Sequence, residues 1–161
     1  MNAAIRIARY IHLDLVEAHA SAWIYCFAIF TSRFKGSMGV LSPADGQGAL
    51  VIPKRFWTMA NYSHFVRPGW KLMQVDGTGF ANTGFINPEG NGFVIVALNP
   101  SENPQPTTYL FDNRTIGAVE AFSTTDNMDL APAPLPATQP HQFSTMLPPM
   151  SVTTFVGRLG H

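Results

Sequence analysis

The sequence predicts a mainly β protein: an antiparallel β-sandwich that follows an N-terminal α/β unit. Near the N-terminus, apolar residues at helical spacing precede one long apolar run, which is the pattern of a helix and a buried strand. After residue 70 the pattern changes to short segments of period two, separated by turn residues. The length of 161 residues allows one ordinary domain, or one domain and a piece of another. It excludes a complete (β/α)₈ barrel, which needs about 250 residues.

The first predicted element is an amphipathic helix of about four turns. Its apolar residues recur at three- and four-residue spacing from Ile5 to Val16. Arg6, Arg9 and Asp14 lie largely on the other side of the helical wheel. This pattern predicts a helix that packs one face against a core.

The second predicted element is a strand over residues 21–30. Its run is apolar at both alternating positions, as is typical of a strand that is covered on both faces. A helix followed by such a strand is one unit of an α/β layer. This unit cannot be stable alone, because the rest of the chain supplies no partner for both faces of the strand.

A loop over residues 31–52 and a second helix follow. The loop is rich in glycine, serine and proline, and Pro53 stands where the first turn of a helix tolerates it. Phe56, Met59 and Ala60 share helical spacing and are expected to form the inner face of this helix. Pro68-Gly69 ends it, because proline removes a donor and glycine supplies a flexible exit.

Seven short strands are predicted in the remainder of the chain. Their spacing and the turn residues between them indicate an antiparallel sandwich or barrel. Proline residues between 132 and 140 stiffen one long connection, which we expect to lie on the surface. The expected strands are 71–76, 84–87, 93–98, 107–111, 118–123, 142–146 and 151–156.

Composition excludes several classes of function. The net charge is zero and only 12% of the residues are charged, so the basic face that nucleic acids and anionic lipids require is absent. The longest apolar run, residues 22–30, is far shorter than the roughly 20 residues of a membrane span, and the N-terminus has no signal-peptide pattern. Cys26 is the single cysteine, so an intrachain disulfide and a thiolate metal cluster are both impossible.

No catalytic or metal-binding motif emerges from the polar residues. Most of the 10 carboxylates fall in predicted turns or on the polar face of the first helix, and the five histidines lack metal-site spacing. Glycine motifs that bind phosphate are absent, and we expect neither a cofactor nor a metal. Asn61 and Asn113 begin glycosylation sequons, which support secretion only weakly because two can occur by chance.

Aromatic residues are the remaining functional candidates. Trp23 and Tyr25 lie two residues apart, on one side of the predicted strand. An aromatic face stacks on the apolar C–H face of a sugar, so this pair is a candidate carbohydrate contact. Core packing is the alternative, and spacing alone favours it. Trp57, Phe65 and Trp70 are better explained as packing between the two unlike regions of the chain.

The sequence resembles the C-terminal part of glycoside hydrolase family 30. The most specific block is residues 53–69, with the pattern Lys-Arg, an aromatic residue and the ending Ser-x-Phe-Val-Arg-Pro-Gly. Residues 21–25 (Ser-Ala-Trp-Ile-Tyr), 93–101 (Phe-Val-Ile-Val-Ala-Leu-Asn-Pro-Ser) and 147–156 (Leu-Pro-Pro-Met-Ser-Val-Thr-Thr-Phe-Val) agree with it. The match runs in order from about residue 4 to residue 158.

This resemblance implies a piece of a retaining glycosidase with a (β/α)₈ barrel and a side β-sandwich. Residues 4–18 would be the seventh barrel helix, 21–29 the eighth strand, 54–66 the eighth helix and 70–158 the sandwich. Both catalytic glutamates would lie upstream of Met1. Trp23 matches an aromatic residue that borders the sugar cleft, and Tyr25 accompanies it, whereas Cys26 stands where relatives have a third aromatic.

We therefore expect two regions, the end of a barrel over residues 1–66 and a sandwich over 67–161. The predicted function is that of a C-terminal fragment of an enzyme that cleaves a β-linked polysaccharide, inactive by itself. The tetrapeptide Ala-Ser-Ala-Trp (residues 20–23) favours the β-1,6-galactanase or glucanase branches, with xylan as the other substrate class. The expected partners are a polysaccharide and the missing barrel portion, with a secreted parent enzyme. The alternative is a free-standing carbohydrate-binding or structural sandwich module.

Overall fold

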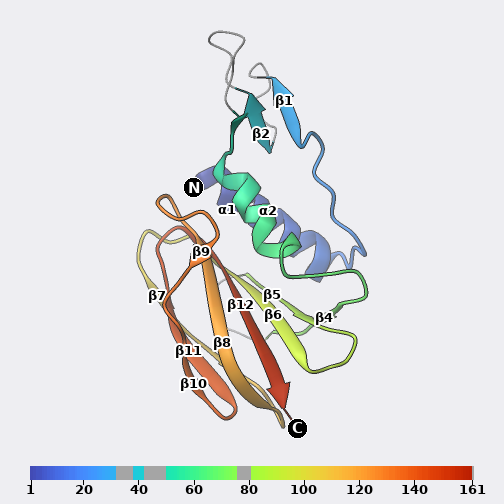
Figure 1. Ribbon diagram of the computed structural model, residues 1–161, viewed down its shortest axis with the longest axis vertical. Helices are drawn as coiled ribbons and strands as arrows, with labels where there is room; N and C mark the ends of the chain where they lie inside the picture. The colour runs from blue at the N-terminus through green and yellow to red at the C-terminus, as the bar shows by residue number, and fades with distance from the viewer. Residues whose placement is uncertain (32–37, 42–49, 76–80, 161) are drawn as a thin grey trace.

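The computed structural model describes residues 1–31, 38–41, 50–75 and 81–160. Two helices lie against one face of a β-sandwich, and a small sheet lies beyond the helices (Figure 1). The prediction of a mainly β protein with antiparallel sheets is confirmed. In the ranges that the structure describes, no helix is both long enough and apolar enough to cross a membrane.

The sandwich consists of a six-stranded and a three-stranded sheet, and in both sheets all neighbouring strands run antiparallel. The larger sheet has the order β4 (Lys71–Met73), β5 (Asn82–Ile86), β6 (Gly92–Asn99), β12 (Ser151–Gly160), β8 (Thr115–Thr124) and β9 (Ala131–Pro132). The smaller sheet has the order β10 (Ala137–Gln139), β11 (Gln142–Leu147) and β7 (Gln105–Leu110).

All seven predicted strands are present, with bounds that differ from the expected ones by a few residues. The last residue of the first of them, Asp76, lies outside the described residues. Strands β9 and β10 were not predicted, because both lie in the proline-rich connection, where proline removes a backbone donor. Each is short and pairs at the edge of its sheet, as the proline content requires.

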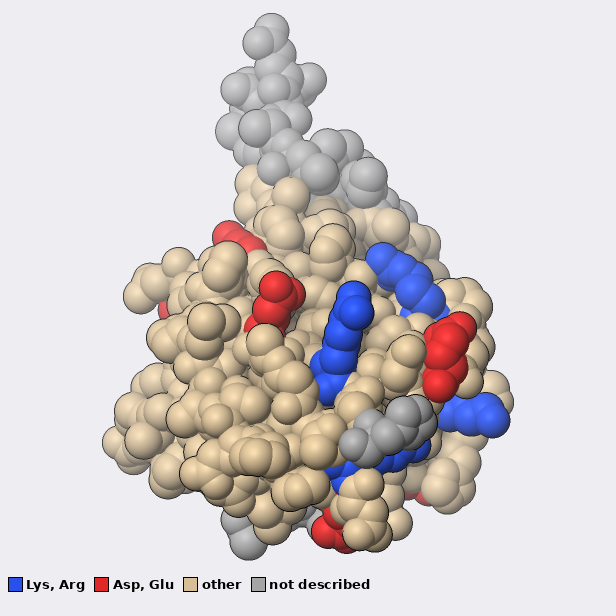
Figure 2. Space-filling view, turned by 60° about the horizontal axis from the view of Figure 1, so that its bottom comes forward, with Lys and Arg blue, Asp and Glu red and all other residues tan. Residues whose placement is uncertain are grey.

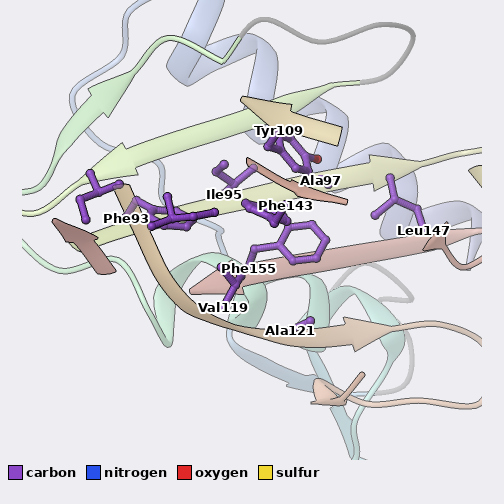
Figure 3. Packing of buried hydrophobic residues seen from close by; sticks show 11 residues of the cluster. Phe93, Ile95, Ala97, Tyr109, Val119, Ala121, Phe143, Leu147 and Phe155 are labelled. Carbon is purple, nitrogen blue, oxygen red and sulfur yellow. The ribbon is translucent and has the colours of Figure 1, made fainter. Parts of the chain in front are cut away.

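Strands β6 and β12 are covered on both faces, and this is why they are apolar or hydroxyl-bearing at nearly every position. Phe93 and Ile95 of β6 point into the core between the two sheets, whereas Val94 and Val96 point into the core beneath the helices. The core between the sheets is rich in aromatic rings, with Phe143 at its centre (Figure 3). The larger sheet therefore separates two hydrophobic cores.

The helix predicted near the N-terminus is confirmed. Helix α1 (Asn2–His12) continues into a π-helical turn, η1 (Leu13–Glu17), so the regular pattern extends over the predicted four turns. Its buried face consists of Ala4, Ile7, Ala8 and Ile11, which pack on the sheet with helix α2 (Lys54–Ser63) beside them. Of the predicted apolar positions, Ala8 and Ile11 are buried and Ile5, His12, Leu15 and Val16 are half-buried, whereas the buried Ala4 and Ile7 were not among them.

The inner face of α2 was predicted incorrectly. Phe56 is among the exposed large apolar residues and Met59 is half-buried, whereas the fully buried positions include Thr58 and Asn61. A prediction from hydrophobic spacing places polar residues on the exposed face of a helix. Asn61 is nevertheless buried, because hydrogen bonds to the sheet satisfy its amide. The buried face of α2 is therefore rotated about the helix axis from the predicted face of Phe56, Met59 and Ala60.

The strand predicted over residues 21–30 is also wrong for most of its length. Residues 21–28 form no strand, and Ile24 is 87% exposed. Only β1 (Ile29–Thr31) pairs, parallel to β2 (Gly39–Leu41), which in turn pairs with β3 (Leu50–Val51). A strand that is apolar at every position needs a pairing neighbour and cover on both faces, and the described part of the chain provides no such neighbour for residues 21–28.

Gly157 of β12 lies against the ring of Phe93, and a Cβ atom built at this position would overlap that ring. Phe93 is fully buried, so it has no room to move away. We expect Gly157→Ala to destabilise the protein by about 1–3 kcal/mol, because overpacking forces neighbouring atoms to shift. Gly117→Ala on β8 is the matched control, since its nearest neighbour would lie at 3.9 Å. Urea unfolding of the two variants tests this, and equal midpoints would contradict it.

Candidate functional site

Trp23 and Tyr25, the sequence-predicted sugar contacts, lie together in the segment between η1 and β1. Their ring centroids are 6.0 Å apart and the ring planes are tilted by 34°. Both side chains are half-buried, and both pack against the core beneath the helices. The structure therefore brings the two predicted residues side by side, with part of each ring left accessible.

Asp14 fixes the orientation of Trp23. The indole Nε1 of Trp23 donates a hydrogen bond of 2.8 Å to Oδ2 of Asp14, which lies in η1. The sequence placed Asp14 on the solvated face of the helix, and its interaction with Trp23 was not predicted. Because a hydrogen bond to a carboxylate is stronger than one between neutral groups, it stabilises one orientation of the indole ring.

A groove of about 380 Å³ adjoins Trp23. It is enclosed by α1, by the segment that carries Trp23, and by α2 with the turn that follows it. Its wall is mostly apolar and aromatic, and one cation contributes to it. The residues that characterise this wall are Leu15, Trp23, Tyr62, Arg67, Trp70 and Phe85.

Arg67 and the turn after α2 form one side of this groove. Both terminal nitrogens of the Arg67 guanidinium donate to backbone carbonyls at the end of the helix, those of Ser63 and His64. These carbonyls have no partner within the helix, so the cation satisfies them and opposes the negative end of the helix dipole. The Arg-Pro-Gly sequence signals this cap, but not its place beside Trp23.

The three aromatic residues that were assigned to packing between regions occupy different environments. Phe65 packs its ring against that of Phe122 of β8, with ring centroids 5.0 Å apart, and Trp70 packs against the core beneath the helices. Trp57 instead contacts Phe56 of its own helix, with the rings edge to face. Phe65 thus links the end of α2 to the sandwich, and Trp70 also lines the groove.

A buried polar network holds the two helices to β5. His12 Nδ1 lies 3.0 Å from the hydroxyl of Thr83, and the Tyr62 hydroxyl donates to the carbonyl of Ala8. Burial lowers the pKa of His12, which a nearby Glu17 partly opposes. Burial also raises the pKa of Tyr62 well above its ordinary range, so the phenol stays protonated. These groups anchor the helices, and their partners are all within the fold.

In the described ranges the acidic residues do not gather into a metal-binding cluster. No group of three or more His, Cys, Asp or Glu side chains among them has a metal-binding arrangement. Asp129 pairs with Lys54 at 2.7 Å, and Asp14 is bonded to Trp23. Asp45 and Asp76 lie outside the described residues.

The two sequons differ in accessibility. Asn61 is completely buried and its amide is bonded to Thr124 and Thr154, so a glycan there is incompatible with this fold. Asn113 is exposed in the turn between β7 and β8, with a positive φ of 56° that asparagine tolerates.

Comparison with known proteins gives relatives in sequence. No protein-family model matches the chain. The glucuronoxylanase XynC of Bacillus subtilis (strain 168) is 29% identical over 154 residues, which cover 95% of this chain and 34% of the relative. The chain therefore spans about a third of the length of the curated relatives it matches.

Solved structures agree over the same extent. A conserved exported protein from Bacteroides fragilis is 29% identical with a TM-score of 0.80, and the match covers 95% of this chain and 33% of that one. The catalytic domain of the GH30 xylanase C from Talaromyces cellulolyticus is 22% identical with a TM-score of 0.81, over 96% of this chain and 34% of that one. These similarities confirm the resemblance to the C-terminal β-sandwich region of glycoside hydrolase family 30.

Proposed function

We propose that this chain is the C-terminal part of a retaining glycoside hydrolase that acts on xylan. The observation that carries the proposal is the similarity of 95% of the chain to a glucuronoxylanase at 29% identity. Since several similar proteins are xylanases by name, xylan is favoured over the β-1,6-galactan or glucan that the Ala-Ser-Ala-Trp tetrapeptide suggests.

In this proposal Trp23 and Tyr25 form part of the wall of the sugar cleft. The accessible part of the Trp23 ring offers an apolar surface to the C–H face of a sugar, and Asp14 holds the ring in place. The adjoining groove, about 380 Å³ and lined by aromatic side chains, falls in the size range of small-ligand sites. These features support a sugar-binding role for Trp23, and the ring of Tyr25 lies beside it.

The catalytic carboxylates belong to a part of the enzyme outside this chain. Retaining hydrolysis needs two carboxyl groups about 5–5.5 Å apart, one as nucleophile and one as acid and base. Of the acidic residues described above, Asp14 is held by the indole of Trp23 and Asp129 by the ammonium group of Lys54. The chain would supply a cleft wall and a supporting sandwich.

The missing barrel portion is the proposed partner of an exposed apolar surface on the helical side. Ile24 and Phe27 are large apolar side chains that are mostly exposed in the segment after η1, and Val51, Ile52 and Phe56 are exposed near the start of α2. Large apolar surfaces of this kind mark interaction sites in soluble proteins. Charged side chains are also few on the sandwich-end face that Figure 2 shows, and only 12% of the residues of the chain are charged.

The parent enzyme is further proposed to be secreted. Polysaccharides such as xylan lie outside the cell, and one of the similar structures is described as an exported protein. A polysaccharide is the only ligand that the proposal requires, and it invokes neither a metal nor a cofactor.

Titration of the chain with xylotetraose, followed by ¹H–¹⁵N NMR, tests the role of Trp23. We expect Trp23→Ala to weaken binding about tenfold, because an aromatic contact contributes about 1–1.5 kcal/mol. Trp23→Phe retains a ring and loses the bond to Asp14, so it should show an intermediate effect. Tyr10→Ala on the exposed side of α1 is the control and should bind as the parent chain does.

Two outcomes would contradict the proposal. If Trp23→Ala binds xylotetraose like the parent chain, the pair has no role in sugar recognition. If a β-1,6-galactan or glucan oligosaccharide of equal length binds and xylotetraose does not, the substrate class is wrong and the other branch is favoured.

A further inference from the structure

The turn between β7 and β8 carries an accessible asparagine that the proposed sugar site does not use. Asn113 is exposed and is followed by Arg114 and Thr115, so it begins an Asn-x-Thr sequon whose middle residue is not proline. Its positive φ of 56° is a conformation that asparagine adopts more readily than most residues. In the part of the chain that the structure describes, no hydrogen bond engages its side-chain amide. The amide nitrogen is therefore free to carry a modification.

The other asparagines with a hydroxyl residue two positions later are unsuitable. Asn61 begins the second sequon, but it is completely buried, and its Nδ2 atom donates to the Trp57 carbonyl and to the Thr124 hydroxyl. Asn99 also precedes a serine by two positions, but Pro100 lies between them and excludes a sequon. Of the sequons in this chain, the one in the turn between β7 and β8 is thus the accessible one.

Contacts next to Asn113 hold this turn in place and leave the asparagine itself exposed. One guanidinium nitrogen of Arg114 donates to the carbonyl of Gly90 at 3.2 Å. The backbone carbonyl of Arg114 accepts a hydrogen bond of 2.8 Å from Nδ1 of His141. The turn is therefore anchored to two other parts of the sandwich, and a group attached to Asn113 would extend into solvent.

Strand β8 separates the turn from the helical side of the molecule. It has 10 residues and begins at Thr115, directly after the turn. Its last residue is Thr124, whose hydroxyl accepts a hydrogen bond from Asn61 of α2. At about 3.3 Å per residue the strand spans about 30 Å, so the turn lies at the end of β8 that is remote from α2 (Figure 1). A group on Asn113 would leave Trp23, which packs on the helical side, uncovered.

We propose that Asn113 is an N-glycosylation site of this protein and that Asn61 is not. The proposal rests on the proposed function for one point, the export of the parent enzyme through a secretory pathway that attaches such glycans. The donor is an oligosaccharide linked to a lipid diphosphate. Nδ2 of Asn113 forms a bond to the anomeric carbon of the oligosaccharide, the bond from that carbon to the diphosphate oxygen breaks, and the amide releases a proton. The lipid diphosphate leaves with the electron pair.

Expression of the full chain in a eukaryotic host, behind a cleavable signal sequence, tests the site by peptide mass spectrometry. Secreted molecules and those in the intracellular membrane fraction are both analysed, so the site is read whether or not the chain leaves the cell. We expect most molecules to carry a glycan on Asn113, which N-glycosidase removes and replaces by an aspartate side chain. Secreted molecules should carry no glycan on Asn61, because its burial is incompatible with a bulky group.

Matched variants connect the glycan to the sequon. Asn113→Asp and Asn113→Gly should abolish the modification, and both residues tolerate the left-handed backbone of the turn. Thr115→Ser preserves the sequon and should retain the glycan. Asn127→Asp changes an exposed asparagine outside any sequon and should leave the glycan unchanged.

Two results would overturn the proposal: an unmodified Asn113 in both fractions, or a glycan on Asn61 in folded, secreted molecules. Titration of the same samples with xylotetraose separates this test from that of the proposed function. An unmodified Asn113 in a chain that binds xylotetraose would overturn the glycosylation site alone. A glycan on Asn113 in a chain that does not bind xylotetraose would support the site and contradict the role proposed for Trp23.

Discussion

Phe143→Ala is expected to destabilise the protein by about 3–5 kcal/mol, the range found when a buried phenylalanine is truncated. Phe143 lies on β11 with no exposed surface and occupies the middle of the core between the sheets (Figure 3). Its ring centroid lies 4.8 Å from that of Tyr109, 5.2 Å from that of Phe155 and 6.1 Å from that of Phe93. The truncation leaves a cavity among rings that come from three strands other than β11.

Urea unfolding measures this loss of stability. A loss of this size is a large part of the 5–15 kcal/mol that is typical of a whole domain, so a large fall in the urea midpoint is expected. Phe143→Leu preserves most of the volume and should cost less than about 1.5 kcal/mol. Phe56→Ala removes the same ring from a more exposed site on α2 and is the second control. A urea midpoint for Phe143→Ala close to that of Phe56→Ala would contradict the placement of Phe143 in the middle of the core.

Asn61→Ala is expected to cost about 2–4 kcal/mol, because it leaves buried hydrogen-bonding groups without partners. Asn61 Nδ2 donates to the Thr124 hydroxyl at 2.7 Å and to the Trp57 carbonyl at 2.9 Å. The Thr154 hydroxyl lies 2.9 Å from Oδ1 and 2.8 Å from the backbone carbonyl of Asn61. One side chain thus joins α2 to β8 and to β12.

Thermal and urea unfolding of Asn61→Ala, with Asn127→Ala as an exposed control, test this role. A double variant, Asn61→Leu with Thr154→Val, removes both groups of the bond between the Thr154 hydroxyl and Oδ1 of Asn61. It should recover part of the stability lost in Asn61→Leu alone. If Asn61→Ala unfolds at the same urea concentration as Asn127→Ala, the amide does not hold the helix to the sheet.

The strands of the sandwich could be predicted from sequence because local signals and tertiary packing agree there. Turn residues bound each segment, and β6 combines strong β propensity with burial on both faces. The short strands in the proline-rich connection could not be predicted. Their pairing depends on the edges of two sheets, which no local pattern reveals.

Residues 21–28 show the opposite case, in which an apolar run does not form a strand. The apolar pattern favours burial, but pairing requires neighbours that the described part of the chain does not place beside these residues. The prediction of the buried face of α2 was wrong for a related reason. Asn61 is buried through specific bonds to Thr124 and Thr154, and a hydrophobic pattern contains no information on such partners.

The candidate site was only partly predictable. Spacing places Trp23 and Tyr25 on one side of an extended segment, and the structure brings their rings together. The bond from Trp23 to Asp14 depends on how η1 turns the chain back toward that segment, so no local pattern of residues indicates it.

We propose that this chain supplies a sugar-binding wall and a sandwich, while the catalytic carboxylates lie elsewhere in the enzyme. The most direct measurement is the release of reducing ends from glucuronoxylan by the purified chain, after its NMR spectrum has shown that it is folded. The predicted result is release equal to that of a buffer blank. Release that rises in proportion to protein concentration, and is abolished by heat denaturation, would contradict the claim.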